Sequence, residues 1–179
     1  MLPNMETVSV SCAWDSYKLS LPRFKHRTRI LLTMVANRRD RGAYRVWTRD
    51  IIRYADVDPN GHVNNGAINA FLEDGRVRFR TEHLAAVAAD TLAGFVLVSF
   101  SVEYHAPLHF PGEVDIGTSI SRLGRTSYGL RQALFVGEQC AASSASVTVC
   151  VDPTTQRKRV LTDEWRALLS EFLVTFDES

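Results

Sequence analysis

The chain has 179 residues, of which 45% are apolar and 23% are charged, and its formal net charge is +1. This length suits one globular domain with an extension, and it allows a sizeable core without disulfide or metal staples. No apolar run approaches the ~20 residues that a membrane-spanning helix needs, so we expect no membrane span.

The charge is distributed unevenly along the chain. Residues 1–43 hold eight Lys and Arg against three Asp and Glu, a balance of +5, and residues 44–179 hold thirteen against seventeen, a balance of −4. The acidic body argues against nucleic acid as the main partner. We interpret 1–43 as a basic, poorly ordered N-terminal extension and 44–179 as the domain. The alternative is a basic arm that binds RNA or an anionic surface.

The three cysteines, Cys12, Cys140 and Cys150, show no spacing typical of a metal ligand set or a redox pair. We therefore expect reduced thiols in a cytoplasmic protein, with no metal and no cofactor.

The predicted elements begin with a strand over 44–54, followed by turn chemistry in "DPNG" at 58–61. Apolar residues then recur at spacings of three and four, which predicts a helix over 66–83. Gly75 costs about 1 kcal/mol relative to alanine inside a helix, and on the buried face it would let the helix lie close to a sheet.

The second half of the chain is dominated by strand patterns. Residues 85–94 predict a short helix or a loop, and four strands are predicted over 94–108, 112–124, 126–137 and 138–153. A final helix is predicted over 162–173, capped by Thr162 or Asp163. The fold class is therefore α+β, with four consecutive hairpin-like strands in one antiparallel sheet and the long helix on one face.

Polar side chains crowd the start of the long helix, in "RYADVDPNGHVNNGAINAFLEDGR" at 53–76. A helix N-terminus carries free N–H groups and a partial positive charge, so the amides near Asn65 and Gly66 can stabilise an oxyanion. Asp58, just before them, could act as nucleophile or general base in hydrolysing an activated acyl group. Taken singly, these residues have simpler roles: Asn64 as a cap, and His62 and Glu73 as solvated side chains.

The whole string closely resembles the signature of hotdog-fold thioesterases of the 4-hydroxybenzoyl-CoA thioesterase type. That signature runs Asp-x-Asp-x-x-Gly-His-Val-Asn-Asn and continues into a helix with Glu-x-x-Arg. The matching residues here are Asp56, Asp58, Gly61, His62, Val63, Asn64, Asn65, Glu73 and Arg76. The downstream strand order resembles the family over roughly 44–160.

The resemblance implies a single hotdog fold, in which a curved antiparallel sheet wraps around one long central helix. It implies an acyl-CoA thioesterase that works as a homodimer or tetramer with active sites between subunits. Asp58 would be the catalytic carboxylate, and the backbone N–H of Asn65 would polarise the thioester carbonyl. His62, Asn64 and the Asn65 side chain would shape the site.

Several alternatives stay open. Plant acyl-carrier-protein thioesterases share a related motif in which Asp58, Asn60 and His62 would all take part, so the carrier could be a protein. Another branch places its carboxylate on the helix, which makes Glu73 the second candidate, although it could instead pair with Arg76. A hydratase of the same fold fits poorly, because His-Val-Asn-Asn is present. A non-catalytic acyl-CoA-binding module is disfavoured by Asp58.

The phosphates of CoA call for Lys or Arg at the mouth of the site. The family often binds the nucleotide near a hairpin with a Gly-[Arg/Lys]-[Ser/Thr]-Ser stretch, here Gly124 to Ser127. Arg125, Thr126 and Ser127 are therefore candidate CoA-binding residues, although solvated charges around a turn are an equally good interpretation. The acyl group itself is not predicted.

Overall fold

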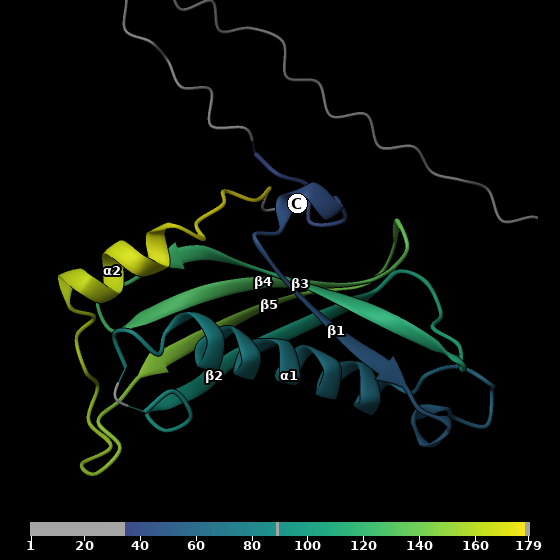
Figure 1. The fold of residues 1–179 in the computed structure, drawn as a ribbon, viewed down its shortest axis with the longest axis horizontal. Helices are drawn as coiled ribbons and strands as arrows, with labels where there is room; N and C mark the ends of the chain where they lie inside the picture. Colours follow the sequence, from purple (N-terminus) through teal and green to yellow (C-terminus); the bar gives the residue numbers. More distant parts are fainter. Residues whose placement is uncertain (1–34, 89, 178–179) are drawn as a thin grey trace, which may run out of the picture. The chain divides into compact units, whose positions relative to one another are not determined.

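The computed structural model describes residues 35–88 and 90–177, so most of the predicted basic extension lies outside the described residues. A strand β1 (Val46–Ile52) leads to the long helix α1 (Asn65–His83). Four further strands follow, and a short helix comes last (Figure 1). They are β2 (Phe95–Tyr104), β3 (Gly112–Leu123), β4 (Ser127–Val136), β5 (Gln139–Cys150) and α2 (Asp163–Ser170). Short 3-10 turns occupy Arg41–Ala43 and Tyr54–Asp56.

The five strands form one antiparallel sheet in the order β1-β3-β4-β5-β2. This confirms the predicted α+β class with one long helix. The expectation that four consecutive strands pair as hairpins was wrong for β2, because β2 pairs with β5 and only β3–β4 and β4–β5 are hairpins. Alternation along a strand indicates which face is buried, but it does not identify the neighbouring strand. In the observed strand order, β1 and β2 are the two edges of the sheet.

Helix α1 lies along one face of the sheet, and the sheet curves around it (Figure 1). It packs mainly against β3, with further contacts to β1 and β4. The buried side of α1 follows the predicted spacing at Ile68, Phe71, Leu72, Gly75 and Phe79, and the side chain of Arg76 is buried as well, which the spacing did not predict. Burial of this apolar stripe is the main force that holds the helix on the sheet.

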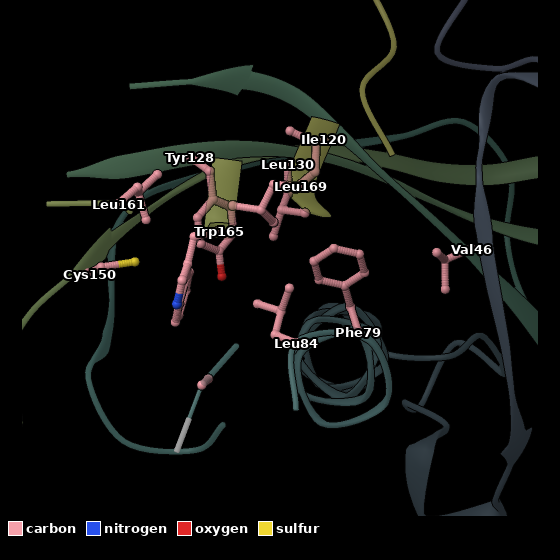
Figure 2. Close-up of a cluster of buried hydrophobic side chains, with 11 residues drawn as sticks. Val46, Phe79, Leu84, Ile120, Tyr128, Leu130, Cys150, Leu161, Trp165 and Leu169 are labelled. Atoms are coloured by element: carbon pink, nitrogen blue, oxygen red, sulfur yellow. The ribbon is translucent and has the colours of Figure 1, made fainter. Parts of the chain in front are cut away.

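A cluster of buried side chains closes the end of the sheet where α1 finishes (Figure 2). Phe79 and Leu84 of this cluster meet Tyr128 and Leu130 from the sheet, and α2 adds Trp165 and Leu169. The Trp165 Nε1 donates a hydrogen bond of 2.7 Å to the carbonyl of Val87. α2 is thereby joined to the segment that follows α1.

Residues 35–43 fall within the predicted extension, and several of them contact the sheet. Arg41 Nη2 lies 2.7 Å from Asp115 Oδ2, and Arg49 Nε lies 2.7 Å from Asp115 Oδ1. The hydroxyl of Tyr44 donates to the carbonyl of Arg38 at 2.6 Å. In the described ranges, no helix is both long and apolar enough to cross a membrane.

Gly75 marks the closest approach of α1 to the sheet. A Cβ at this position would lie 2.7 Å from Ile116 Cγ2 and 2.9 Å from Gln132 Nε2. We predict that Gly75→Ala lowers the free energy of unfolding by about 1–3 kcal/mol, because overpacking outweighs the gain in helix propensity.

Chemical denaturation measures this difference, and Asn69→Ala at an exposed position of the same helix is the control, expected to be neutral or slightly stabilising. A Gly75→Ala protein as stable as the wild type would contradict the close packing.

Candidate active site

The loop between β1 and α1 is closed by backbone hydrogen bonds. Asp58 N donates to His62 O at 2.8 Å, and Val63 N donates to Leu108 O at 2.9 Å. Gly61 has a φ of +78°, which suits glycine in the turn predicted at 58–61. The loop therefore holds a fixed shape against the segment that follows β2.

Asp58 sits at the centre of this turn. Its carboxylate accepts hydrogen bonds from the backbone N–H of Asn60 at 2.8 Å, from Asn60 Nδ2 at 3.3 Å and from the backbone N–H of His62 at 3.3 Å. Partial desolvation raises the pKa of Asp58, but the hydrogen bonds from Asn60 and His62 outweigh it and hold this pKa below its ordinary value. Asp58 is therefore ionised at neutral pH.

The N-terminus of α1 opens beside this carboxylate. Asn64 caps the helix, because its Oδ1 accepts from Ala67 N at 2.8 Å while its Nδ2 donates to Asp56 O at 2.9 Å. The backbone N–H groups of Asn65 and Gly66 find no acceptor within the described part of the chain. These two free donors are available to a carbonyl or an anion.

Asp58, His62 and Asn65 line one open cleft of about 340 Å³. Its opposite wall comes from the end of β2 and the segment after it, and the complete lining is Asp58, His62, Val63, Asn65, Ile68, Tyr104, His105, Ala106, Pro107 and Leu108. The structure thus brings the predicted carboxylate and the predicted amide donor into one cavity, and Asn60 orients the carboxylate.

Two histidines near the cleft were not among the predicted site residues. The ring of His109 lies edge-on to that of His62, with centroids 5.0 Å apart. His105 Nε2 lies 2.8 Å from Ser143 Oγ, and burial lowers the pKa of His105 below its ordinary value. The sequence signal was the pair of histidines in "YHAPLHF", directly after a strand.

Glu73 does not reach this cleft. It is exposed on α1, eight residues beyond Asn65, which is about 12 Å along the helix axis. It forms no ion pair with Arg76, whose Nη1 instead donates to Gln132 Oε1 at 3.3 Å. The suggested Glu73–Arg76 pair is therefore not formed.

Of the candidate phosphate-binding residues, Arg125 and Thr126 lie in the turn between β3 and β4, where Arg125 is exposed, and Ser127 is the first residue of β4. The Asp58 loop follows β1, whose last residue, Ile52, pairs with Gly112 at the first residue of β3. Arg125, Thr126 and Ser127 follow the last residue of β3, roughly 35 Å away along the strand. Within one chain, the structure therefore does not bring this turn to Asp58.

In the ranges 35–88 and 90–177, no group of three or more His, Cys, Asp or Glu side chains is arranged to hold a metal ion. The two described cysteines, Cys140 and Cys150, are free thiols, and burial raises the pKa of each to about 11.

Known proteins are similar to this chain in sequence and in fold. An acyl-CoA thioester hydrolase, YbgC of Escherichia coli, is 30% identical over 125 residues, or 68% of this chain and 90% of that protein. The PA5185 protein of Pseudomonas aeruginosa has a solved structure with a TM-score of 0.68 and 27% identity, covering 77% of this chain and 98% of that one.

A thioesterase from Thermus thermophilus, solved with coenzyme A and zinc, has a TM-score of 0.63 and 27% identity, covering 70% of this chain and 98% of that one. The model of the thioesterase-like superfamily matches residues 52–170, which include the loop, α1 and every strand after it. The chain therefore belongs to the thioesterase-like superfamily and has the hotdog fold.

Proposed function

We propose that this protein hydrolyses an acyl-CoA thioester to a carboxylic acid and CoA, with Asp58 as the catalytic carboxylate. The observation that carries the proposal is the shared cleft, in which an ionised carboxylate faces the same cavity as the start of a helix with free N–H groups. YbgC, which is named an acyl-CoA thioester hydrolase, supports the choice of substrate class.

In this mechanism the thioester carbonyl oxygen accepts a hydrogen bond from the backbone N–H of Asn65, and Gly66 N–H lies next to it. Negative charge that develops on this oxygen is stabilised by the fixed donors and by the helix dipole. His62 and Asn64 shape the pocket, since His62 helps to hold Asp58 and Asn64 holds the helix start.

Asp58 can act in two ways. As a general base it takes a proton from water, which attacks the carbonyl carbon, and the carbon–sulfur bond breaks to release CoA thiolate. As a nucleophile it attacks the carbonyl carbon, the carbon–sulfur bond breaks to release CoA thiolate, and water then hydrolyses the resulting acyl anhydride to the acid and free Asp58. Asn60 keeps the carboxylate oriented in either case.

We further propose that the active unit is a homodimer joined at the β2 edges. β2 exposes Val96, Leu97, Val98 and Tyr104, an apolar row on an unpaired strand edge. Tyr104 lies at the Asp58 end of the sheet, and Phe95 lies at the end with the β3–β4 turn. Antiparallel pairing of two β2 strands would bring the turn of one copy towards the Asp58 loop of the other.

This arrangement gives Arg125, Thr126 and Ser127 a role that one chain alone does not allow. They would contact the CoA phosphates bound at the partner's Asp58 site.

A tetramer could form from two such dimers. An acyl-carrier-protein thioester is the alternative substrate, and a non-catalytic binding module is the alternative function. The free thiols of Cys140 and Cys150 are in keeping with a cytoplasmic location.

Removal of Asp58 tests the central assignment. We predict that Asp58→Ala lowers kcat for acyl-CoA hydrolysis by at least ~10²–10³-fold, the loss typical of a preorganised catalytic group. Release of free thiol from a panel of aliphatic and aromatic acyl-CoAs measures it. Asp152→Ala removes another carboxylate that accepts backbone N–H bonds in a turn, and it should retain most of the activity. Near-normal turnover by Asp58→Ala would exclude Asp58.

The acid limb of the pH–rate profile depends on the ionisation of Asp58. Asn60→Ala removes the side-chain donor that helps to lower this pKa and leaves the backbone donor in place. We predict that the acid limb of kcat/KM moves to higher pH, because protonation of Asp58 abolishes activity and now occurs more readily. An unchanged acid limb would show that another group controls it.

Arg125 tests the contribution of the second copy. Arg125→Glu should raise KM for acyl-CoA, and Arg45→Glu, an equal charge change at another exposed arginine, should not. An unchanged KM for Arg125→Glu would remove this residue from the site.

Mixing inactive Asp58→Ala with Arg125→Glu subunits sharpens the test. If the turn serves the partner's site, each mixed dimer contains one site with both native residues, and activity with wild-type KM reappears. No recovery of a wild-type site in mixed dimers would contradict the shared arrangement.

A further inference from the structure

Helix α1 and strand β2 run side by side away from the Asp58 cleft. Ile68 and Tyr104 both line that cleft. Further along, the guanidinium of Arg76 lies 4.8 Å from the ring centroid of Phe100, and that of Arg80 lies 5.2 Å from that of Phe95. Moving along α1 from the cleft, one therefore meets two arginines that face the same edge strand.

Arg76 is a buried cation, and the carboxylate of Glu73 lies nearby without forming an ion pair with it. Only 6% of the residue is exposed, and burial lowers the pKa of its guanidinium, while the charge of Glu73 acts in the opposite direction. Among the described residues, neither Arg76 nor Arg80 forms an ion pair. Arg80 donates from Nε to the carbonyl of Thr91 at 3.2 Å. A buried guanidinium without a direct ion-pair partner is costly, so its presence here calls for an explanation.

The sheet beneath Arg76 carries polar side chains, and two of their hydroxyl groups lack hydrogen-bond partners among the described residues. Arg76 contacts Gln132 on β4 and Phe100 on β2, and β5 runs between these two strands. Ser144 pairs with Gln132 and Ser146 pairs with Phe100, so both serines lie below the guanidinium. Their hydroxyls are buried and have no hydrogen-bond partner among the residues that the structure describes. Buried, unpaired hydroxyls are rare unless a water or a ligand completes them.

A cavity of about 80 Å³ opens beside the two arginines. It is lined by Glu73, Arg76, Val77, Arg80, Phe95, Leu97 and Thr148. Its formal charge is +1, because Arg76 and Arg80 outweigh Glu73 at the rim. The volume is sufficient for a carboxylate group, since a liquid water molecule occupies about 30 Å³.

We propose that this cavity is an anion site that takes a carboxylate carried by the acyl group of the thioester. Arg76 would bind the carboxylate, Arg80 would add charge, and the hydroxyl of Thr148, which lines the cavity, would supply a donor. The inference rests on the proposed thioesterase function and narrows its substrate class. From Asn65 to Arg76 the helix rises about 16 Å, so the carboxylate must be remote from the thioester. The substrate class is an ω-carboxyacyl thioester.

The test compares two acyl-CoA series of matched chain length, one ending in a carboxylate and one in a methyl group. The wild type should prefer the carboxylate-ended form by roughly tenfold to a hundredfold in kcat/KM, the value of a charge-assisted hydrogen bond. This preference should peak at one chain length. A ratio of kcat/KM values (carboxylate series over methyl series) near one at every chain length would overturn the proposal. Thiol release from the methyl series would still support the proposed thioesterase function.

The variant Arg76→Met keeps an apolar stem and removes the charge. It should reduce the preference to about one, whereas Arg78→Met on the same helix should keep it, because Arg78 pairs with Asp74 outside this cavity. Arg76→Lys keeps the positive charge but changes the shape of the side chain. If it restores the preference for the carboxylate-ended series, the charge of Arg76 and not its packing is responsible. If Arg76→Met instead lowers both series equally, the arginine is structural and the proposal fails.

Calorimetry with free α,ω-dicarboxylic acids gives a readout that needs no catalysis. The wild type should bind the acid of the preferred length, and Arg76→Met should bind it at least tenfold more weakly. The same carboxylate chemistry could come from a second copy of this chain. In that case Arg76→Met would weaken self-association, the wild type would not bind the free diacids, and the substrate proposal would be overturned.

Discussion

The site depends on how one asparagine joins the loop to the helix. Asn64 donates to the carbonyl of Asp56 from both its backbone N and its Nδ2, at 2.8 and 2.9 Å, and its Oδ1 accepts from Ala67 N. These contacts fix the point at which α1 begins, so the N–H groups of Asn65 and Gly66 find no acceptor in the part of the chain that the structure describes. They also hold the loop that carries Asp58 against the helix start. The anionic carboxylate of Asp58 and the helix-start residue Asn65 then line one cleft.

The sheet makes this arrangement rigid. Gly75 lets α1 lie against Ile116 and Gln132, and the buried stripe of the helix anchors it along β3. The cleft is completed by the segment after β2, which receives the hydrogen bond from Val63 N to Leu108 O. Catalytic geometry of this kind relies on donors that need no rearrangement during the reaction. The rest of the fold therefore acts as support for one helix terminus.

The local parts of this structure could be predicted because their signals are local. The turn chemistry around Asp58, the cap at Asn64 and the spacing of Ile68, Phe71 and Phe79 all lie within one short stretch. The place of β2 could not be predicted, because alternation does not show that a strand crosses to pair with β5. The polar row beneath Arg76 was missed for the same reason. The position of Ser144 and Ser146 beneath Arg76 follows only from the pairing of β5 with β4 and with β2.

The position of the β3–β4 turn also required the fold. In the sequence, Arg125 seemed able to serve the same site as Asp58, but the two lie at opposite ends of β3. This separation, together with the exposed apolar edge of β2, is the physical reason for proposing that two copies build each site. A single-chain site would leave the CoA phosphates without these residues.

The most direct test of the central claim is a crystal structure with a non-hydrolysable acyl-CoA analogue, in which a methylene group replaces the thioester sulfur. The account predicts the carbonyl oxygen within hydrogen-bond distance of Asn65 N, with the Asp58 carboxylate facing the carbonyl carbon directly or through one water. A carbonyl bound away from the start of α1, with Asp58 contacting only solvent, would contradict it.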